Sequence, residues 1–213
     1  NNKMYSAGQP IPGTEIKIVD PETKKRLGKN QKGLVLVRGP QVMLEYYKDE
    51  EATNAAIDRQ GWFNTGDLGW LSNDNTLVLT GRYKDTIVLS NGENIEPAGI
   101  EEACLLSPYV RQIVLVGQDK AALGALITPN VEAIKEWARN KNQENISPQK
   151  VISDKDFQRF LHKDLQNRVL SRPNFRPFEQ IARIKILNEE FSVENGLMTP
   201  TAKIRKNKVL EKY

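Results

Sequence analysis

The sequence has 213 residues, of which 27% are charged and 38% are hydrophobic. This balance is typical of a globular chain and excludes an intrinsically disordered one. No apolar run approaches the roughly 20 residues of a membrane-spanning helix, and residues 1–10 lack the apolar stretch of a signal peptide. The single cysteine, Cys104, and the single histidine, His162, exclude an intramolecular disulfide and a zinc site built from cysteines or histidines.

The net charge of +4 lies at one end of the chain. The last eleven residues hold five basic side chains and one acidic one, whereas the preceding residues carry equal numbers of both. A basic tail suits a nucleic-acid or protein binding module without catalytic activity, which is the alternative function considered for this chain. Nucleic-acid binding predicts aromatic residues interleaved with the cations, and the tail offers only Tyr213. We therefore expect no nucleic-acid partner.

The first part of the chain predicts short strands punctuated by glycine turns. Strand patterns cover residues 16–19, 34–37 and 77–79, and a helix capped by Asp49 is expected within about residues 49–58. A further strand is expected to end at Phe63. Asp67 would then project from the following turn, in which Gly66 can take a positive φ.

The rest of the chain alternates strand and helix patterns. Strands are expected at 86–89, 113–116, 123–127 and 184–187, and helices from Pro97, over 131–138, over 157–169 and over 203–213. Residues 140–153 indicate a polar surface loop, and Ser153 with Asp156 fits a capping box. We expect an α+β protein, with a mostly β subdomain over residues 1–82 and a small α/β domain over residues 83–213.

Three segments could carry chemistry. In GWFNTGDL (61–68), Asp67 offers two acceptor oxygens that suit a ribose diol. In GRYKDTIVLSNGENIEP (81–97), Arg82 offers a planar donor fork beside an Asn91-Gly92 turn, and in GLMTPTAKIRK (196–206) a rigid loop could aim Lys203 at an anion. Taken singly, each segment also fits a structural role, as a turn carboxylate, a charged hairpin or a solvated lysine.

Together these segments resemble the motifs of the adenylate-forming enzymes, which include acyl-CoA synthetases, firefly-luciferase-like enzymes and peptide-synthetase adenylation domains. GQPIPGTEIKIVD (8–20) is similar to the segment after that family's YGxTE motif, and KGLVLVRGPQVMLEYYKDEEAT (32–53) resembles its GELxxxGxxxxxGYxxxPExT stretch. The resemblance is collinear over essentially the whole chain. The wording SNGENIEP is closest to long-chain acyl-CoA synthetases and acyl-acyl-carrier-protein synthetases.

The resemblance implies an ATP-dependent ligase that acts in two steps. A long-chain fatty acid attacks the α-phosphate of ATP to give acyl-adenylate and pyrophosphate, and a thiol on CoA or on the phosphopantetheine of an acyl carrier protein then takes the acyl group. The choice between these two acceptors stays open. Mg²⁺ is implied through ATP, although this sequence shows no dedicated ligand set for it. A cytoplasmic location is expected, with peripheral membrane association of the whole enzyme left open.

The resemblance also implies that this sequence is the C-terminal part of a larger enzyme. The family's phosphate loop and YGxTE motif are absent from these 213 residues, and so is a GxxxxGK[ST] sequence. The chain would then complete the large domain with its β subdomain and supply the mobile C-terminal lid. We expect it to be inactive alone.

Five residues receive roles from the resemblance. Asp67 and Arg82 would bind the ribose, and Lys84 would be the hinge of the lid. Gly92 would line the path of the pantetheine thiol, and Lys203 would be the catalytic residue that reaches the α-phosphate and the substrate carboxylate.

The sequence departs from the family pattern at two positions. Glu45 stands where the family usually has glycine before Tyr46, and Ala202 replaces the glycine that usually precedes the lysine. Neither change removes a side chain with an assigned role.

Overall fold

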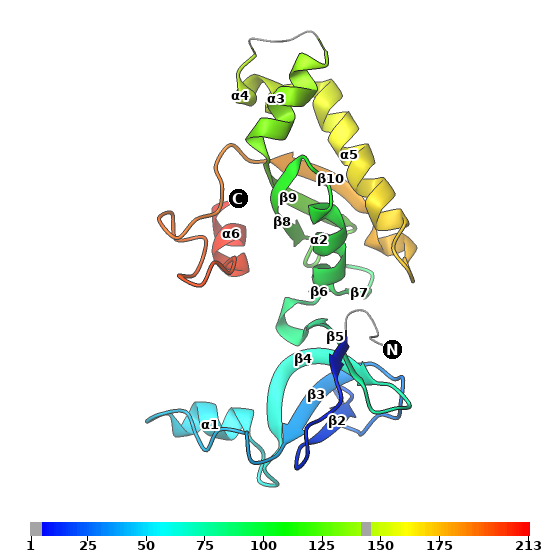
Figure 1. Ribbon diagram of the computed structural model, residues 1–213, viewed down its shortest axis with the longest axis vertical. Helices are drawn as coiled ribbons and strands as arrows, with labels where there is room; N and C mark the ends of the chain where they lie inside the picture. The colour runs from blue at the N-terminus through cyan, green and yellow to red at the C-terminus, as the bar shows by residue number, and fades with distance from the viewer. Residues whose placement is uncertain (1–5, 142–145) are drawn as a thin grey trace. The chain divides into compact units, whose positions relative to one another are not determined.

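The computed structural model describes residues 6–141 and 146–213, which form mixed helix and strand, as expected for an α+β protein (Figure 1). The chain divides into two compact units, Asn1–Thr86 and Ile87–Tyr213. Within the described ranges, no helix has the length and apolar character needed to cross a membrane.

The first unit is built on a five-stranded antiparallel sheet in the order β1-β5-β4-β3-β2. Its strands are β1 (Ser6–Gly8), β2 (Glu15–Val19), β3 (Gly33–Arg38), β4 (Phe63–Leu71) and β5 (Leu77–Arg82). A small core forms where Ile18, Val35 and Leu71 pack together. The strands expected from residues 16–19, 34–37 and 77–79 are confirmed.

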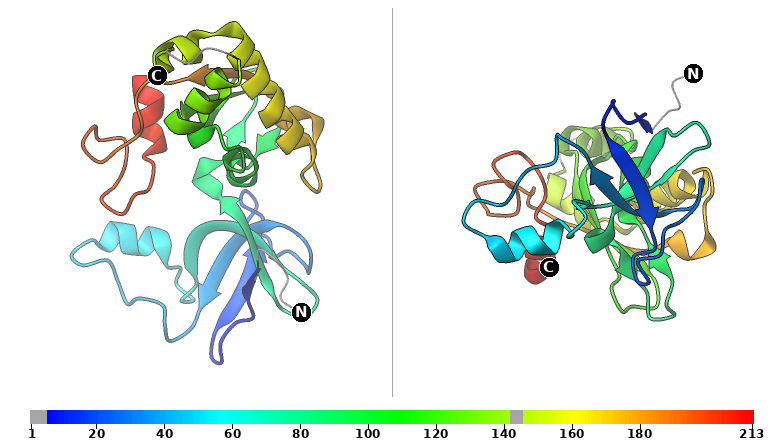
Figure 2. Two further views of the ribbon diagram at one scale, coloured as in Figure 1. Left: turned by 45° about the horizontal axis from the view of Figure 1, so that its top comes forward. Right: turned by 90° about the horizontal axis from the view of Figure 1, so that it is seen from below.

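Helix α1 (Glu50–Ala56) begins where the sequence predicts. The Asp49 carboxylate accepts a hydrogen bond of 2.9 Å from the Ala52 N–H, which satisfies one of the free donors at the helix start. No residue of α1 is buried, and the helix lies beside the sheet rather than across it (Figure 2).

The expectation that a strand ends at Phe63 is wrong, because β4 begins at this residue and runs to Leu71. Leu34 pairs with Leu68 but Leu36 pairs with Asn64, so β4 contains extra residues that bulge out of the ladder. Gly66 has the expected positive φ of 72°, but it lies in this bulge and not in a turn after the strand. Pairing resumes beyond the bulge, where Leu68 and Gly69 lie opposite residues of both β3 and β5.

The second unit is built on a three-stranded sheet in the order β10-β9-β8. Strand β8 (Val110–Val116) is antiparallel to β9 (Leu123–Pro129), and β9 is parallel to β10 (Ile181–Ile186). The parallel pair is joined by a crossover of helices, which are α3 (Val131–Arg139), α4 (Pro148–Ser153) and α5 (Lys155–Leu170). A short hairpin of β6 (Ile87–Val88) and β7 (Asn94–Ile95) leads into α2 (Pro97–Leu105).

Both faces of this sheet are covered. Ile113 and Leu115 face a large core shared with α2, α3 and α5, whereas Val114 faces a second core made by the segment after β10. Figure 1 shows α5 on one side of the strands and α6 (Lys206–Lys212) on the other. Burial of each large apolar side chain contributes about 1.5–3 kcal/mol, so the C-terminal segment is held to the sheet chiefly by its apolar residues.

Part of the loop expected over residues 140–153 is helical. Pro148 occupies the first turn of α4, where a missing N–H costs nothing. Val151 and Ile152 are buried and give the short helix an inner face, a pattern too brief to stand out in a polar stretch. Residues 142–145 lie outside the described residues.

The boundaries of two later helices also differ from expectation. Asp154, rather than Ser153, caps α5, and its carboxylate accepts from the N–H groups of Asp156 and Phe157. Helix α6 starts at Lys206 rather than at Lys203, because residues 199–203 form a closed turn.

Candidate functional site

Asp67 and Arg82 are directly opposite each other on β4 and β5. Arg82 Nε lies 3.1 Å from Asp67 Oδ1, with the arginine side chain 66% exposed and the aspartate 27% exposed. Such an exposed pair contributes under about 1 kcal/mol to stability. Within the described residues, Asp67 Oδ2 and the two terminal nitrogens of Arg82 have no partner. The pair therefore presents a free acceptor beside free donors, as binding of a vicinal diol requires.

Thr65 holds the bulge that carries Asp67, and the sequence analysis did not single it out. Its hydroxyl donates to the Val35 carbonyl at 3.0 Å and accepts from the Asp67 N–H at 3.0 Å. The Gly66 N–H is held in turn by the Asn64 side chain. The available signal was the threonine two residues before Asp67, since hydroxyls commonly bond the backbone two positions on.

Lys84 lies in a single 3-10 turn, Tyr83–Asp85, just before the end of the first unit at Thr86. The residues on either side, Arg82 and Thr86, have extended backbone conformations. The Lys84 side chain is exposed and has no partner within the described residues. Rotation of the backbone at this turn stays a prediction from the sequence.

Gly92 closes the turn of the β6–β7 hairpin. Its N–H donates to the Leu89 carbonyl at 2.9 Å, and its φ is 84°, a left-handed conformation that glycine adopts without strain. A Cβ at this position would meet no heavy atom within 4 Å. The hairpin therefore presents open backbone at Gly92.

Lys203 follows a second turn of the same kind. The Ala202 N–H donates to the Thr199 carbonyl at 2.9 Å, and Ala202 takes a left-handed φ of 59°. The Thr199 N–H donates to the Lys203 carbonyl at 2.8 Å, and the Thr199 hydroxyl accepts from the Lys203 N–H at 3.1 Å. The backbone of Lys203 is thus fixed on both sides while its side chain is exposed.

The basic tail is partly neutralised within the chain. Three of its five cations form ion pairs, which are Lys206 with Glu101, Lys208 with Glu211 and Lys212 with Glu189. Hydrogen bonds from Lys212 and Asn195 lower the pKa of Glu189, and the bond to Glu189 raises the pKa of Lys212. Among the residues that the structure describes, Lys203 and Arg205 have no carboxylate partner. Lys203 is therefore a free cation on a fixed turn.

The structure brings together only part of the expected set. Asp67 and Arg82 are paired in the first unit, and Lys84 lies in the link that ends it. Gly92 and Lys203 lie on separate turns of the second unit. In residues 6–141 and 146–213, no group of three or more His, Cys, Asp or Glu side chains could hold a metal ion. These residues do not fit a Mg²⁺ site, and no step is assigned to one.

Two family models match the chain. Residues 1–47 match the AMP-binding enzyme family, and residues 84–162 match the AMP-binding enzyme C-terminal domain. The chain belongs to the AMP-binding enzymes. Its strand pair with Asp67 and Arg82 falls between the two matched ranges.

Relatives among the AMP-binding enzymes match over nearly the whole chain. Two are from Arabidopsis thaliana: a probable acyl-activating enzyme 16, chloroplastic, and the long-chain-fatty-acid–[acyl-carrier-protein] ligase AEE15, chloroplastic. They are 44% and 43% identical over 100% of this chain. The long-chain-fatty-acid–CoA ligase FadD15 of Mycobacterium tuberculosis is 34% identical over 99% of it. The chain spans 28–33% of the length of these relatives.

Solved structures agree with the fold. The O-succinylbenzoate coenzyme A synthetase MenE of Bacillus subtilis, in complex with AMP, matches with a TM-score of 0.70 at 25% identity. The match covers 97% of this chain and 35% of that one.

Proposed function

We propose that this chain supplies the ribose-binding strand pair and the mobile lid of a long-chain fatty-acid ligase. The whole enzyme would form acyl-AMP from ATP and a long-chain fatty acid and then pass the acyl group to a thiol. The observation that carries the proposal is the Asp67–Arg82 pair, which leaves one carboxylate oxygen and the arginine's terminal nitrogens open. The names of the relatives support the substrate class.

Each assigned residue has one task in this scheme. Asp67 accepts hydrogen bonds from the ribose hydroxyls, and Arg82 donates to the same sugar. The Lys203 ammonium offsets the negative charge that grows on the α-phosphate as the carboxylate attacks. Rotation of the second unit about Lys84 then replaces the Lys203 turn at the reaction site by the Gly92 turn. The absence of a side chain at Gly92 lets the thiol arm pass close to the backbone.

We further propose an acyl carrier protein, rather than CoA, as the thiol acceptor. The relative named as a carrier-protein ligase is 43% identical, and the one named as a CoA ligase is 34% identical. A shallow groove of about 550 Å³ between α5 and β10 is lined by the cations Lys155, Arg159 and Arg183. Lys155 and Arg183 have no carboxylate partner within the described residues, so the groove suits an acidic protein.

The proposed ligase is tested in the whole enzyme with Lys203→Ala. ATP–pyrophosphate exchange should fall by about 10²–10³-fold, while thioester formation from supplied acyl-adenylate is largely retained. Lys208→Ala removes a tail cation that already pairs with Glu211 and should change neither step. Equal loss of both steps with Lys203→Ala would refute the assigned role. The 213-residue chain alone should give no exchange.

The acceptor is tested by comparing thioester formation with CoA and with a carrier protein. A preference for CoA would refute the carrier-protein assignment and leave the ligase itself intact. A cytoplasmic location stays a prediction, since the Arabidopsis relatives are named as chloroplastic.

A further inference from the structure

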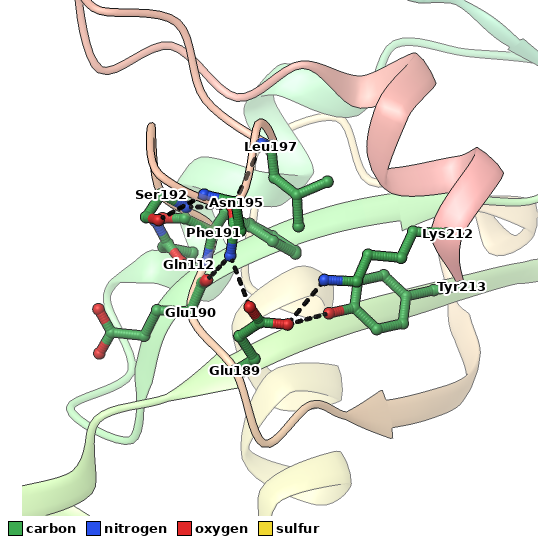
Figure 3. A network of polar contacts seen from close by, with 9 residues as sticks. All are labelled: Gln112, Glu189, Glu190, Phe191, Ser192, Asn195, Leu197, Lys212 and Tyr213. Carbon is green, nitrogen blue, oxygen red and sulfur yellow. Dashed lines mark hydrogen bonds and ion pairs between the residues drawn. The ribbon is translucent and has the colours of Figure 1, made fainter.

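The segment that carries Lys203 leaves the sheet after β10 and is anchored in the second core by Leu187 and then by Phe191. The Phe191 side chain is 2% exposed and belongs to the second core with Val114, Leu126 and Val209. This apolar contact holds the segment to the sheet, but a ring in a core leaves the direction of the backbone undetermined. Polar contacts supply that direction (Figure 3).

Gln112 on β8 fixes the backbone at Phe191 through both ends of its amide. Its Nε2 donates to the Phe191 carbonyl at 2.9 Å, and its Oε1 accepts from the Phe191 N–H at 2.8 Å. The hydroxyl of the fully buried Thr128 donates to the same Oε1 at 3.0 Å. Two-point pairing with a backbone unit sets orientation as well as distance, as a rung of a β-ladder does. Figure 3 shows the amide facing this unit of the loop.

Asn195 fixes the next turn of the same segment through both the oxygen and the nitrogen of its side-chain amide. Its Oδ1 accepts from the N–H groups of Ser192 at 3.0 Å and Leu197 at 3.2 Å. Its Nδ2 donates to the Glu190 carbonyl at 2.8 Å and to Glu189 Oε1 at 3.0 Å. A side chain that meets four partners within one loop leaves that loop little freedom.

A short path of hydrogen bonds joins these two amides to the lysine turn. The Met198 N–H donates to the Ser192 carbonyl at 2.9 Å. Met198 also pairs with Ile204 across the turn and is followed by Thr199, which bonds the Lys203 backbone on both sides. The position of the Lys203 Cα therefore depends on Gln112 and Asn195, although neither residue contacts Lys203 directly.

We infer that Gln112 and Asn195 are positioning residues for Lys203, which they hold in the place needed for adenylation through the Phe191–Met198 backbone. The inference rests on the proposed function of Lys203. Within the described residues, neither amide forms a hydrogen bond with the Gly92 turn, to which the thiolation step is assigned. Loss of either should therefore lower the rate of adenylation and leave the second step unaffected.

The test uses Gln112→Met in the whole enzyme, because methionine keeps the length and packing of the side chain but forms neither hydrogen bond. The kcat of ATP–pyrophosphate exchange should fall by about tenfold or more with little change in the KM for ATP. Thioester formation from supplied acyl-adenylate should stay within about twofold. The matched control is Gln166→Met, which removes a hydrogen bond from α5 to the Ile181 carbonyl on β10 and should leave both steps unchanged.

Asn195→Asp provides a second variant if Gln112→Met folds poorly. It keeps both acceptor contacts but loses the donations to Glu189 and Glu190, and it should show the same selective loss. Hydrogen exchange of residues 188–204 should quicken by about tenfold in either variant and not in Gln166→Met. The inference would be overturned if the rates of hydrogen exchange and of adenylation stayed within about twofold of those of the unaltered enzyme. Equal loss of adenylation and thioester formation would overturn it too.

The two proposals fail in different ways. If the unaltered enzyme forms no acyl-adenylate, the proposed function is refuted. Hydrogen exchange of residues 188–204 would still show whether Gln112 and Asn195 restrain the loop. An active enzyme whose variants keep full adenylation refutes only the positioning roles.

Discussion

Lys206 and Lys208 lie on the same short helix, but the ion pair formed by Lys206 is more buried than the one formed by Lys208. Lys206 Nζ lies 3.1 and 2.9 Å from the two carboxylate oxygens of Glu101, with side chains 27% and 14% exposed. Lys208 pairs with Glu211 at 2.7 Å, with side chains 58% and 63% exposed. Replacement of each lysine by methionine keeps the aliphatic stem and removes the charge.

The expected cost follows from this difference in burial. Fully exposed pairs contribute about 0–1 kcal/mol, and loss of one partner of a fully buried pair costs about 3–5 kcal/mol. Glu101 also accepts from the Leu115 N–H at 2.9 Å, so the carboxylate keeps one partner when Lys206 is lost. We therefore expect Lys206→Met to lower the free energy of unfolding by about 2 kcal/mol and Lys208→Met by under about 0.5 kcal/mol.

Urea unfolding followed by far-UV circular dichroism measures the difference. Of the six α-helices formed by residues 6–141 and 146–213, five belong to the second unit, so the helical signal reports chiefly on it. A loss of about 2 kcal/mol corresponds to a midpoint shift of about 1 M urea. Equal midpoint shifts for the two variants would refute the reasoning that the more buried Lys206–Glu101 pair stabilises the fold more than the exposed Lys208–Glu211 pair.

Three further predictions concern Thr65, Ala202 and Cys104. Thr65→Val removes both hydroxyl contacts of the bulge, at about 1 kcal/mol each. It should raise the KM for ATP of the whole enzyme; an unchanged KM would show that the bulge does not aim Asp67. Ala202→Val should lower the urea midpoint, because a β-branched residue is strained at a φ of 59°, whereas Ala202→Gly should not; matching midpoints would contradict this reasoning. Burial raises the pKa of the Cys104 thiol from 9.0 to about 12. The unfolded chain then loses this proton first as the pH rises, so the free energy of unfolding should fall between these values, by up to about 1.4 kcal/mol per pH unit. The Cys104→Ala variant should lack this contribution to the fall in stability with pH when urea midpoints are compared across the same pH range. An equal fall in both proteins would contradict the raised pKa of the thiol.

The elements that the sequence predicted well are those with a regular apolar period. The alternation of Ile16 and Ile18 and the helical spacing of Phe157, Leu161 and Leu165 each place side chains on one buried face, and burial decides the structure. Helix α4 was missed because a pair of adjacent apolar residues, Val151 and Ile152, shows no period.

The candidate site was predicted residue by residue, but its geometry was not. Asp67 and Arg82 were assigned to one ligand from the resemblance alone. Their direct pairing depends on the bulge in β4 and a register shift opposite it, and a shift of one residue would turn Asp67 to the other face of the sheet. The anchors of Lys203 are equally invisible in sequence, since Gln112 and Phe191 lie 79 residues apart.

The contact between α6 and α2 also sets an order of assembly during synthesis. Lys206 and Glu101 are 105 positions apart, so their pairing must wait until the crossover from β9 to β10 has emerged from the ribosome. Until then, Val114 and Leu126 lie on a sheet face that lacks the α6 residue Val209. The Gly92 hairpin can therefore mature on the nascent chain well before the Lys203 turn is built. A ribosome stalled just before α6 would hold a second unit with an uncovered apolar face, which is a target for chaperones.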